Sequence, residues 1–124
     1  PCSATGIFRR HPDVLHRARA GIVTEMAALQ ARILARAAEW VRPGGTLVYA
    51  TCSLEPEEGE RQLESFLAAR GDYRLDGRLR DSLPGLFADA VRGEEGPYVR
   101  TLPGLLADQG GCDGFFIARL IRKA

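Results

Sequence analysis

Two cysteines, each followed by a serine, are the residues of this sequence best suited to covalent chemistry. Cys2 stands in the opening run PCSATGIFRR, and Cys52 stands in the run YATCSLEPEE. A cysteine thiolate is a strong nucleophile and can form covalent intermediates with a substrate. A free cysteine more often packs inertly in a core, which is the interpretation we keep for Cys112. Cys2 and Cys52 are therefore the candidate nucleophiles.

Histidines that could activate these thiols are few. His11 lies close to Cys2 in the sequence, so a cysteine-histidine hydrolase is one alternative, although arginines flank this histidine and no orienting partner is evident. His16 falls near a helix start and is expected at the surface. The chain has two histidines, three widely spaced cysteines and no Cys-x-x-Cys pair, so we expect no zinc site or other metal site.

The overall composition is that of an ordinary soluble globular domain. Hydrophobic residues make up 45% of the 124 positions and charged residues 27%. The sequence has no apolar run approaching the roughly 20 residues of a membrane-spanning helix, and no signal-peptide pattern. An odd number of widely spaced cysteines argues against a disulfide framework. We therefore expect a reduced, cytoplasmic setting and no membrane association.

Charge is nearly balanced overall but uneven along the chain. The net charge of +1 argues against a polybasic nucleic-acid binder. The first twenty residues nevertheless hold four arginines, among them the pair Arg9 and Arg10. Genome composition is the simpler explanation, because nearly every basic residue of the chain is arginine. The functional explanation is contact with phosphate groups, whose oxygens the guanidinium fork binds two at a time.

Two helices are predicted to flank the second cysteine. Residues 22–41 carry apolar side chains at steps of three and four, which is the pattern of one buried helix face. Pro43 and the two glycines after it end this helix. Pro56 and the acidic residues around it suit the first turn of a second helix, over about residues 57–69.

Strands are predicted before Cys52 and near the end of the chain. Residues 46–51 form a nearly continuous apolar run, which is typical of a strand buried on both faces of a parallel sheet. Cys52 follows the end of this strand, the place where open α/β sheets bind ligands. Residues 72–75 suit a short strand, and residues 114–121 a strong closing strand.

The alternation of helices and strands predicts an α/β fold. Residues 77–111 hold seven glycines and three prolines, so they form either a long irregular loop or a segment with short pieces of structure. Two or three strands are too few for a stable sheet of this class. We therefore expect residues 1–124 to be the C-terminal part of a larger domain. Surface made for missing strands would then be exposed and favour self-association.

Three runs of the sequence together resemble one enzyme family. PCSATGIFRRHPD (1–13) and GGTLVYATCSLEPEEGE (44–60) are similar to the fourth and sixth motifs of RNA (cytosine-5-)-methyltransferases of the Sun/Fmu (RsmB-like) family, bacterial 16S rRNA type. CDGFFIARLIRK (112–123) is similar to the closing motif of that family. The runs occur in the family's order and cover about a third of the chain.

The resemblance implies a Rossmann-like methyltransferase that moves a methyl group from S-adenosylmethionine to carbon 5 of a cytosine in ribosomal RNA. In this family the Thr-Cys-Ser cysteine, here Cys52, is the nucleophile that adds to the ring. The Pro-Cys cysteine, here Cys2, is associated with product release. The target base must leave its stack to reach the thiol. Arg9, Arg10 and residues 77–111 are candidates for holding the flanking phosphates.

The resemblance also implies that part of the site lies outside this chain. The family's fourth motif begins with an aspartate before the Pro-Cys, and its glycine-rich cofactor loop lies further upstream. Neither is present in residues 1–124, so we assign no cofactor-binding residue and expect the chain alone to be inactive. The alternative is a non-catalytic RNA-binding or scaffold remnant of the family, and a cysteine hydrolase ranks below both.

Overall fold

A long amphipathic helix forms one layer of the molecule. The structure is a computed structural model that describes all 124 residues. Helix α2 runs from Ala20 to Trp40, close to the predicted range 22–41, and buries Leu34 and Ala38. The short helix α1 (Val14–Arg17) precedes it. No helix combines the length and the apolar character that crossing a lipid bilayer requires.

The sheet is organised around the last of its five strands, which are β1 (Thr46–Thr51), β2 (Tyr73–Leu75), β3 (Val91–Arg92), β4 (Tyr98–Thr101) and β5 (Phe115–Arg122). β5 pairs antiparallel with β1 along one edge; along its other edge it pairs antiparallel with β4 through its first residues and with β2 through its last ones. β3 pairs only with β4. The predicted strands at 46–51, 72–75 and 114–121 are confirmed.

The surroundings of β1 differ from those predicted for its residues. Its apolar run predicted a strand buried on both faces of a parallel sheet, and that prediction was wrong. β1 pairs antiparallel and only with β5, so its second edge has no partner strand. Leu47 and Tyr49 pack against the core that the helices share, whereas Val48, on the opposite face of the strand, is 58% exposed.

The second helix begins later than predicted. A single helix was expected over about residues 57–69, but a 3-10 turn, η2 (Pro56–Glu58), precedes helix α3 (Glu60–Ala69). Gly59 separates them and has no room for a side chain, because a Cβ there would lie 2.6 Å from the Arg100 guanidinium. At this break Glu58 points inward and is fully buried.

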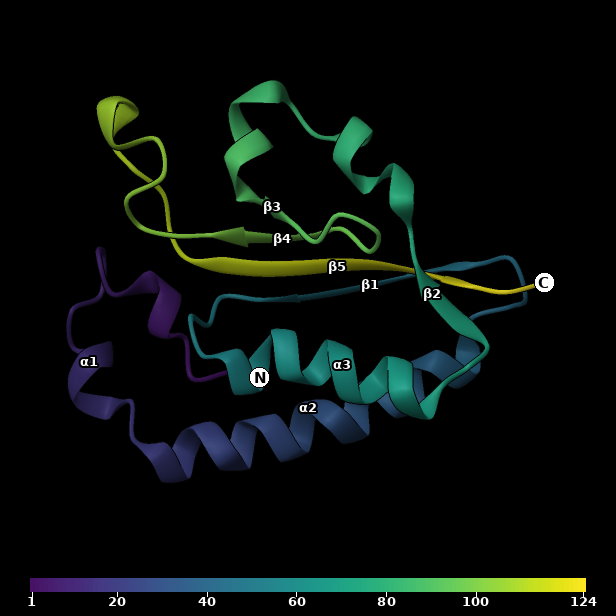
Figure 1. Cartoon of the computed structure of the whole chain (residues 1–124). Coiled ribbons are helices and arrows are strands. Elements are labelled where there is room, and N and C mark those ends of the chain that lie inside the picture. The colour runs from purple at the N-terminus through teal and green to yellow at the C-terminus, as the bar shows by residue number, and fades with distance from the viewer.

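Helices α2 and α3 cover one face of the sheet, and the 3-10 helices η3 (Gly77–Ser82) and η4 (Gly85–Ala90) pack on the other (Figure 1). Side chains along β5 alternate between these two layers, as they must in a strand. Ile117 packs toward the smaller cluster that includes Leu79 and Val99. The residues that face the helices form the main core, where each large apolar side chain contributes about 1.5–3 kcal/mol. Its buried members are Leu34, Ala38, Leu63, Phe66, Tyr73, Phe116, Ala118 and Leu120.

Residues 77–111 contain short pieces of structure. Of the two forms that the sequence left open, a long irregular loop or a segment with short pieces of structure, the structure shows the second. Besides β3 and β4, the segment contains the 3-10 helices η3 (Gly77–Ser82), η4 (Gly85–Ala90) and η5 (Ala107–Gln109). The segment therefore extends the sheet past β5 and packs its own small cluster against it.

A candidate active site at two cysteines

The two candidate nucleophiles lie side by side. Cys52 follows the last residue of β1, and Cys2 lies in the loop before the 3-10 turn η1 (Thr5–Ile7). Their sulfur atoms are 3.3 Å apart, within hydrogen-bonding distance for two thiols, and either can be the donor. Both side chains are half-buried. The fold therefore joins two cysteines that are 50 residues apart in the sequence.

A close backbone approach at Gly6 holds the two cysteine loops together. Gly6 donates its N–H to the Cys52 carbonyl at 2.8 Å, and its own carbonyl accepts from the Gly114 N–H at 2.7 Å. A Cβ at this position would lie 2.0 Å from the Gly114 oxygen and 2.6 Å from the Cys52 oxygen, so only glycine fits. The three runs that carry the family resemblance thus meet at one point.

Arg9 and Arg10 bind the segment that leads into β5. Arg10 donates to Asp113 through Nε at 2.9 Å and Nη2 at 2.5 Å, and the Arg9 guanidinium donates to the Gly110 carbonyl. The hydrogen bond from Arg10 lowers the pKa of Asp113. The Arg10 side chain is still 62% exposed. The structure therefore gives both arginines an internal role, while phosphate contact stays a prediction.

The serines that follow the cysteines share a partner that sequence reasoning missed. Ser3 and Ser53 both donate to the carboxylate of Glu58, and Gln30 of α2 donates to it as well. Glu58 belongs to the acidic run 55–60, whose composition predicts the solvent-exposed first turn of a helix. Nothing in the residue pattern marks which glutamate of that run turns inward.

Arg100 is a second residue that sequence reasoning missed. This arginine of β4 is 7% exposed and donates to the Ser53 carbonyl at 2.5 Å. Its guanidinium also binds both carboxylate oxygens of Glu60, at 2.7 and 2.8 Å. Burial acts to raise the pKa of Glu60, but the hydrogen bonds from Arg100, a backbone hydrogen bond and the charge of Arg100 together outweigh it, so the pKa is lowered. The ion pair thus fixes the backbone beside Cys52 against α3 and β4.

The surroundings of Cys52 favour its thiol over its thiolate. Burial, the hydrogen bond to Cys2 and the charge of Glu58 together raise the pKa of Cys52 to about 11. The thiol form therefore predominates near neutral pH. Cys2 is the only side chain that hydrogen-bonds to the Cys52 sulfur, so no carboxylate or imidazole of this chain is placed to remove its proton.

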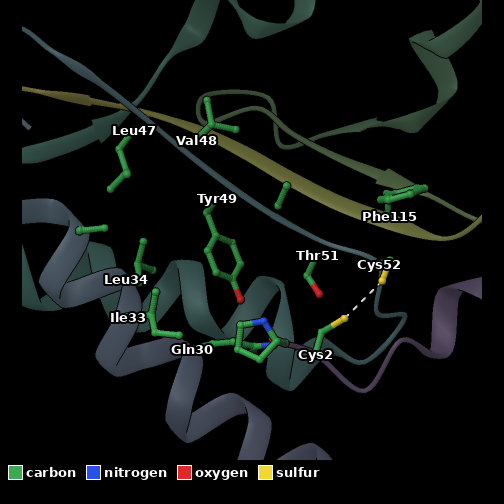
Figure 2. A pocket seen from close by; sticks show the side chains of 13 residues that line it. Cys2, Gln30, Ile33, Leu34, Leu47, Val48, Tyr49, Thr51, Cys52 and Phe115 are labelled. Atoms are coloured by element: carbon green, nitrogen blue, oxygen red, sulfur yellow. Dashed lines mark hydrogen bonds between the residues drawn. The ribbon is translucent and has the colours of Figure 1, made fainter.

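A pocket of about 400 Å³ runs along the free edge of β1, between that strand and α2 (Figure 2). The two thiols lie at one end of it. Hydrophobic residues account for 10 of the 13 that line it, and no carboxylate is among them. A nucleoside-containing methyl donor needs a partner for its ribose hydroxyls and its amino-acid end. We assign no donor-binding residue in this pocket, whose polar lining includes Gln30, Tyr49 and Thr51.

The remaining candidates are not part of this arrangement. His11 and His16 are exposed, and neither imidazole hydrogen-bonds to a thiol. The Cys112 thiol donates to the Leu102 carbonyl at 3.3 Å, which agrees with a packing role. A cysteine hydrolase requires a base that contacts its nucleophile, so that alternative has no support here.

Mild oxidation should join Cys2 to Cys52. A disulfide needs sulfur atoms about 2 Å apart, and these two already lie 3.3 Å from each other. We expect oxidised dithiothreitol at pH 8 to give an internal disulfide, seen as a loss of two hydrogens by mass spectrometry and located by peptide mapping. A Cys112→Ser variant should react at the same rate. A disulfide that includes Cys112 would contradict the geometry.

Comparisons with known proteins find relatives that match nearly the whole chain. Ribosomal RNA small subunit methyltransferase B of Cronobacter sakazakii is 43% identical over 123 residues, which are 99% of this chain and 25% of that protein. The solved structure of PH0851 is 31% identical with a TM-score of 0.79, over 97% of this chain and 24% of that one. NSun6 from Pyrococcus horikoshii, solved with SFG, is 26% identical with a TM-score of 0.75, over 100% of this chain and 28% of that one.

These matches also define how much of a relative the chain represents. It spans about a quarter of the length of the curated relatives that it matches. Its sheet and helices correspond to part of a Rossmann-like methyltransferase domain, as the resemblance implied. The profile of a family described as 16S rRNA methyltransferase RsmB/F matches residues 1–121. The chain therefore belongs to the 16S rRNA methyltransferase RsmB/F family.

Proposed function

We propose that this chain is the nucleophile-bearing part of an S-adenosylmethionine-dependent enzyme that methylates carbon 5 of a cytosine in ribosomal RNA. The observation that carries the proposal is the 3.3 Å contact between the Cys2 and Cys52 thiols in a member of the RsmB/F family. Cytosine-5 chemistry uses a thiol that adds to the ring and must later leave it. Two adjacent thiols at the end of a strand suit such a reversible addition.

Cys52 is the proposed nucleophile. Its thiolate adds to carbon 6 of cytosine, which makes carbon 5 electron-rich. S-adenosylmethionine supplies the electrophilic methyl group that carbon 5 attacks. A base then removes the proton from carbon 5, and the carbon–sulfur bond breaks to restore the ring double bond. Because the pKa of Cys52 is raised to about 11 in this chain, its ionisation requires a group from the RNA or from another part of the protein.

Cys2 is proposed to assist the release of the product. Its sulfur is the one side-chain group in contact with the Cys52 sulfur. A thiol there can donate a hydrogen bond to the departing thiolate of Cys52 and so stabilise the charge that develops as the carbon–sulfur bond breaks. Addition and release are thereby assigned to different residues of one pair.

The methyl donor and the RNA are proposed to be held largely by residues outside this chain. A neighbour of known structure was solved with SFG, an analogue of S-adenosylmethionine, which supports use of this donor in the family. The pocket beside the thiols has no carboxylate for such a donor. The isolated chain is therefore proposed to be inactive. Arg9 and Arg10 lie at the surface next to the closing motif, where they can meet RNA phosphates.

The product is best identified in a full-length protein that carries this chain. We expect such a protein to transfer a labelled methyl group from S-adenosylmethionine to unmodified 16S rRNA, and bisulfite sequencing to show one cytosine protected from deamination. Label that enters without bisulfite protection would place the methyl group elsewhere and contradict the proposal.

Two controls accompany this experiment. A Cys52→Ser variant should incorporate no label, whereas a Cys112→Ser variant should retain full activity because its thiol only contacts the Leu102 carbonyl. The isolated 124-residue chain should give no incorporation above background. Activity of the isolated chain would show that the donor site lies within it.

A further inference from the structure

A carboxylate without a cationic partner lies directly behind the two thiols. Glu58 is 0% exposed, and no arginine, lysine or histidine contacts its side chain. Four donors surround it instead. Oε1 accepts from the Ser3 N–H at 2.8 Å and from Gln30 Nε2 at 2.9 Å. Oε2 accepts from the Ser53 hydroxyl at 2.6 Å and from the Ser3 hydroxyl.

Packing alone does not explain a carboxylate at this buried position. Burying a carboxylate without a cation is unfavourable unless hydrogen bonds satisfy it, and an apolar residue of similar size would pack as well. All four partners of Glu58 are able to donate, so both oxygens of its side chain are satisfied by hydrogen bonds. The backbone carbonyl of Glu58 also accepts from the Tyr49 hydroxyl at 2.6 Å, which ties η2 to β1. The carboxylate is therefore held rigidly in a position that both cysteine loops share.

We propose that Glu58 is a positioning residue that holds Cys2 beside Cys52. Ser3 adjoins Cys2 and Ser53 adjoins Cys52, so one carboxylate sets the separation of the two loops. Gln30 anchors it to α2 and also donates to the Pro1 carbonyl at 2.8 Å. The part that this placement plays in methyl transfer rests on the proposed function, whereas the placement of the thiols does not.

The substitution Glu58→Gln separates charge and hydrogen bonding from size. Glutamine has nearly the same shape, but an NH₂ group replaces one acceptor oxygen. Turned one way, that group faces the Ser3 N–H and the Gln30 NH₂, which cannot accept a hydrogen bond. Turned the other way, it faces the Ser3 and Ser53 hydroxyls, which must rotate to accept from it. In either orientation the hydrogen bonds to the charged carboxylate are lost or replaced by weaker neutral ones. The negative charge disappears as well. Because this charge is one cause of the raised pKa of Cys52, its removal should lower that pKa.

The test uses the rate at which oxidised dithiothreitol converts the two thiols to a disulfide, in a Cys112→Ser background. Overall the thiols give up two protons and two electrons, which reduce the reagent to its dithiol. In the first step one thiol forms a mixed disulfide with the reagent. In the second step the other thiol displaces the reagent, which requires the sulfur atoms of Cys2 and Cys52 to meet. We expect Glu58→Gln to slow this step about tenfold, as the loss of one charge-assisted hydrogen bond implies. Iodoacetamide should meanwhile alkylate Cys52 at a lower pH than in the parent.

The matched control is Glu57→Gln. This change removes the same charge one position away, where the side chain is partly exposed and pairs with Arg61 at 3.1 Å. Both the disulfide rate and the alkylation profile should then stay within about twofold of the parent. Circular dichroism confirms that each variant is folded. A folded Glu58→Gln variant with the parent's disulfide rate would overturn the proposal.

A second variant covers the case in which Glu58→Gln fails to fold. Ser53→Ala keeps the carboxylate but removes one of its donors, so it should slow disulfide formation without lowering the pH at which Cys52 is alkylated. An unchanged disulfide rate in folded Ser53→Ala would overturn the proposal too. None of these measurements involves methyl transfer. Failure of cytosine methylation would therefore leave the positioning role intact, and failure of the thiol tests would leave the proposed reaction intact.

Discussion

Replacing Cys2 with alanine in a full-length protein that carries this chain should trap a covalent complex with RNA. In the proposed mechanism Cys52 can still add to the ring, but the thiol 3.3 Å away that is proposed to assist its departure is gone. The complex should survive detergent and migrate as a slow protein band that ribonuclease removes. Turnover should fall by about 100-fold or more, while a single round of methyl transfer persists.

The second cysteine provides the decisive control for this result. Cys2→Ala combined with Cys52→Ala should form no complex, and Cys52→Ala alone should lose methylation by about 10⁴-fold or more, as removal of a covalent nucleophile does. A complex that persists without Cys52 would mean that the roles of the two cysteines are reversed.

Replacing Gly6 with alanine should destabilise the folded chain severely. The new methyl group would lie 2.0 Å from the Gly114 oxygen and 2.6 Å from the Cys52 oxygen. Both obstacles are backbone atoms, so no side-chain rotation relieves the clash. The hydrogen bonds of Gly6 to these two segments would lengthen or break. Overpacking and two weakened hydrogen bonds should together lower the free energy of unfolding by about 3–5 kcal/mol, measured by urea denaturation.

Gly21→Ala is the matched control for this substitution. Gly21 lies in the first turn of α2, and a Cβ there would meet nothing within 4 Å. Alanine has the higher helix propensity, so this variant should equal the parent or exceed it by up to about 1 kcal/mol. If both variants unfold at the parent's urea concentration, the close approach at Gly6 does not exist.

Local periodicity predicted much of the fold but not the partners of its strands. The amphipathic spacing of residues 22–41 predicted α2 to within two residues, because helix period depends on neighbours along the chain. The apolar run 46–51 predicted a strand correctly but its burial wrongly. Which edges and faces of a strand are covered depends on distant segments, here β5 on one edge and no strand on the other.

Sequence reasoning singled out the two thiols of the candidate site but missed the residues that support them. Cys2 and Cys52 stand out because thiols are rare and reactive, and the structure brings them together. Glu58 and Arg100 do not stand out, because glutamate and arginine are usually exposed. Their burial follows from the sharp break at Gly59 and from the inward face of β4, and neither feature has a local sequence signal.

The central place of β5 has a consequence for the order of events during synthesis. Four of the five strands precede β5 in the chain, and β3 with β4 is the only strand pair that forms without it. The hydrogen bond from Gly114 to Gly6, just before β5, joins residues at opposite ends of the sequence. On a translating ribosome the thiol pair therefore stays unassembled until this last strand has left the exit tunnel.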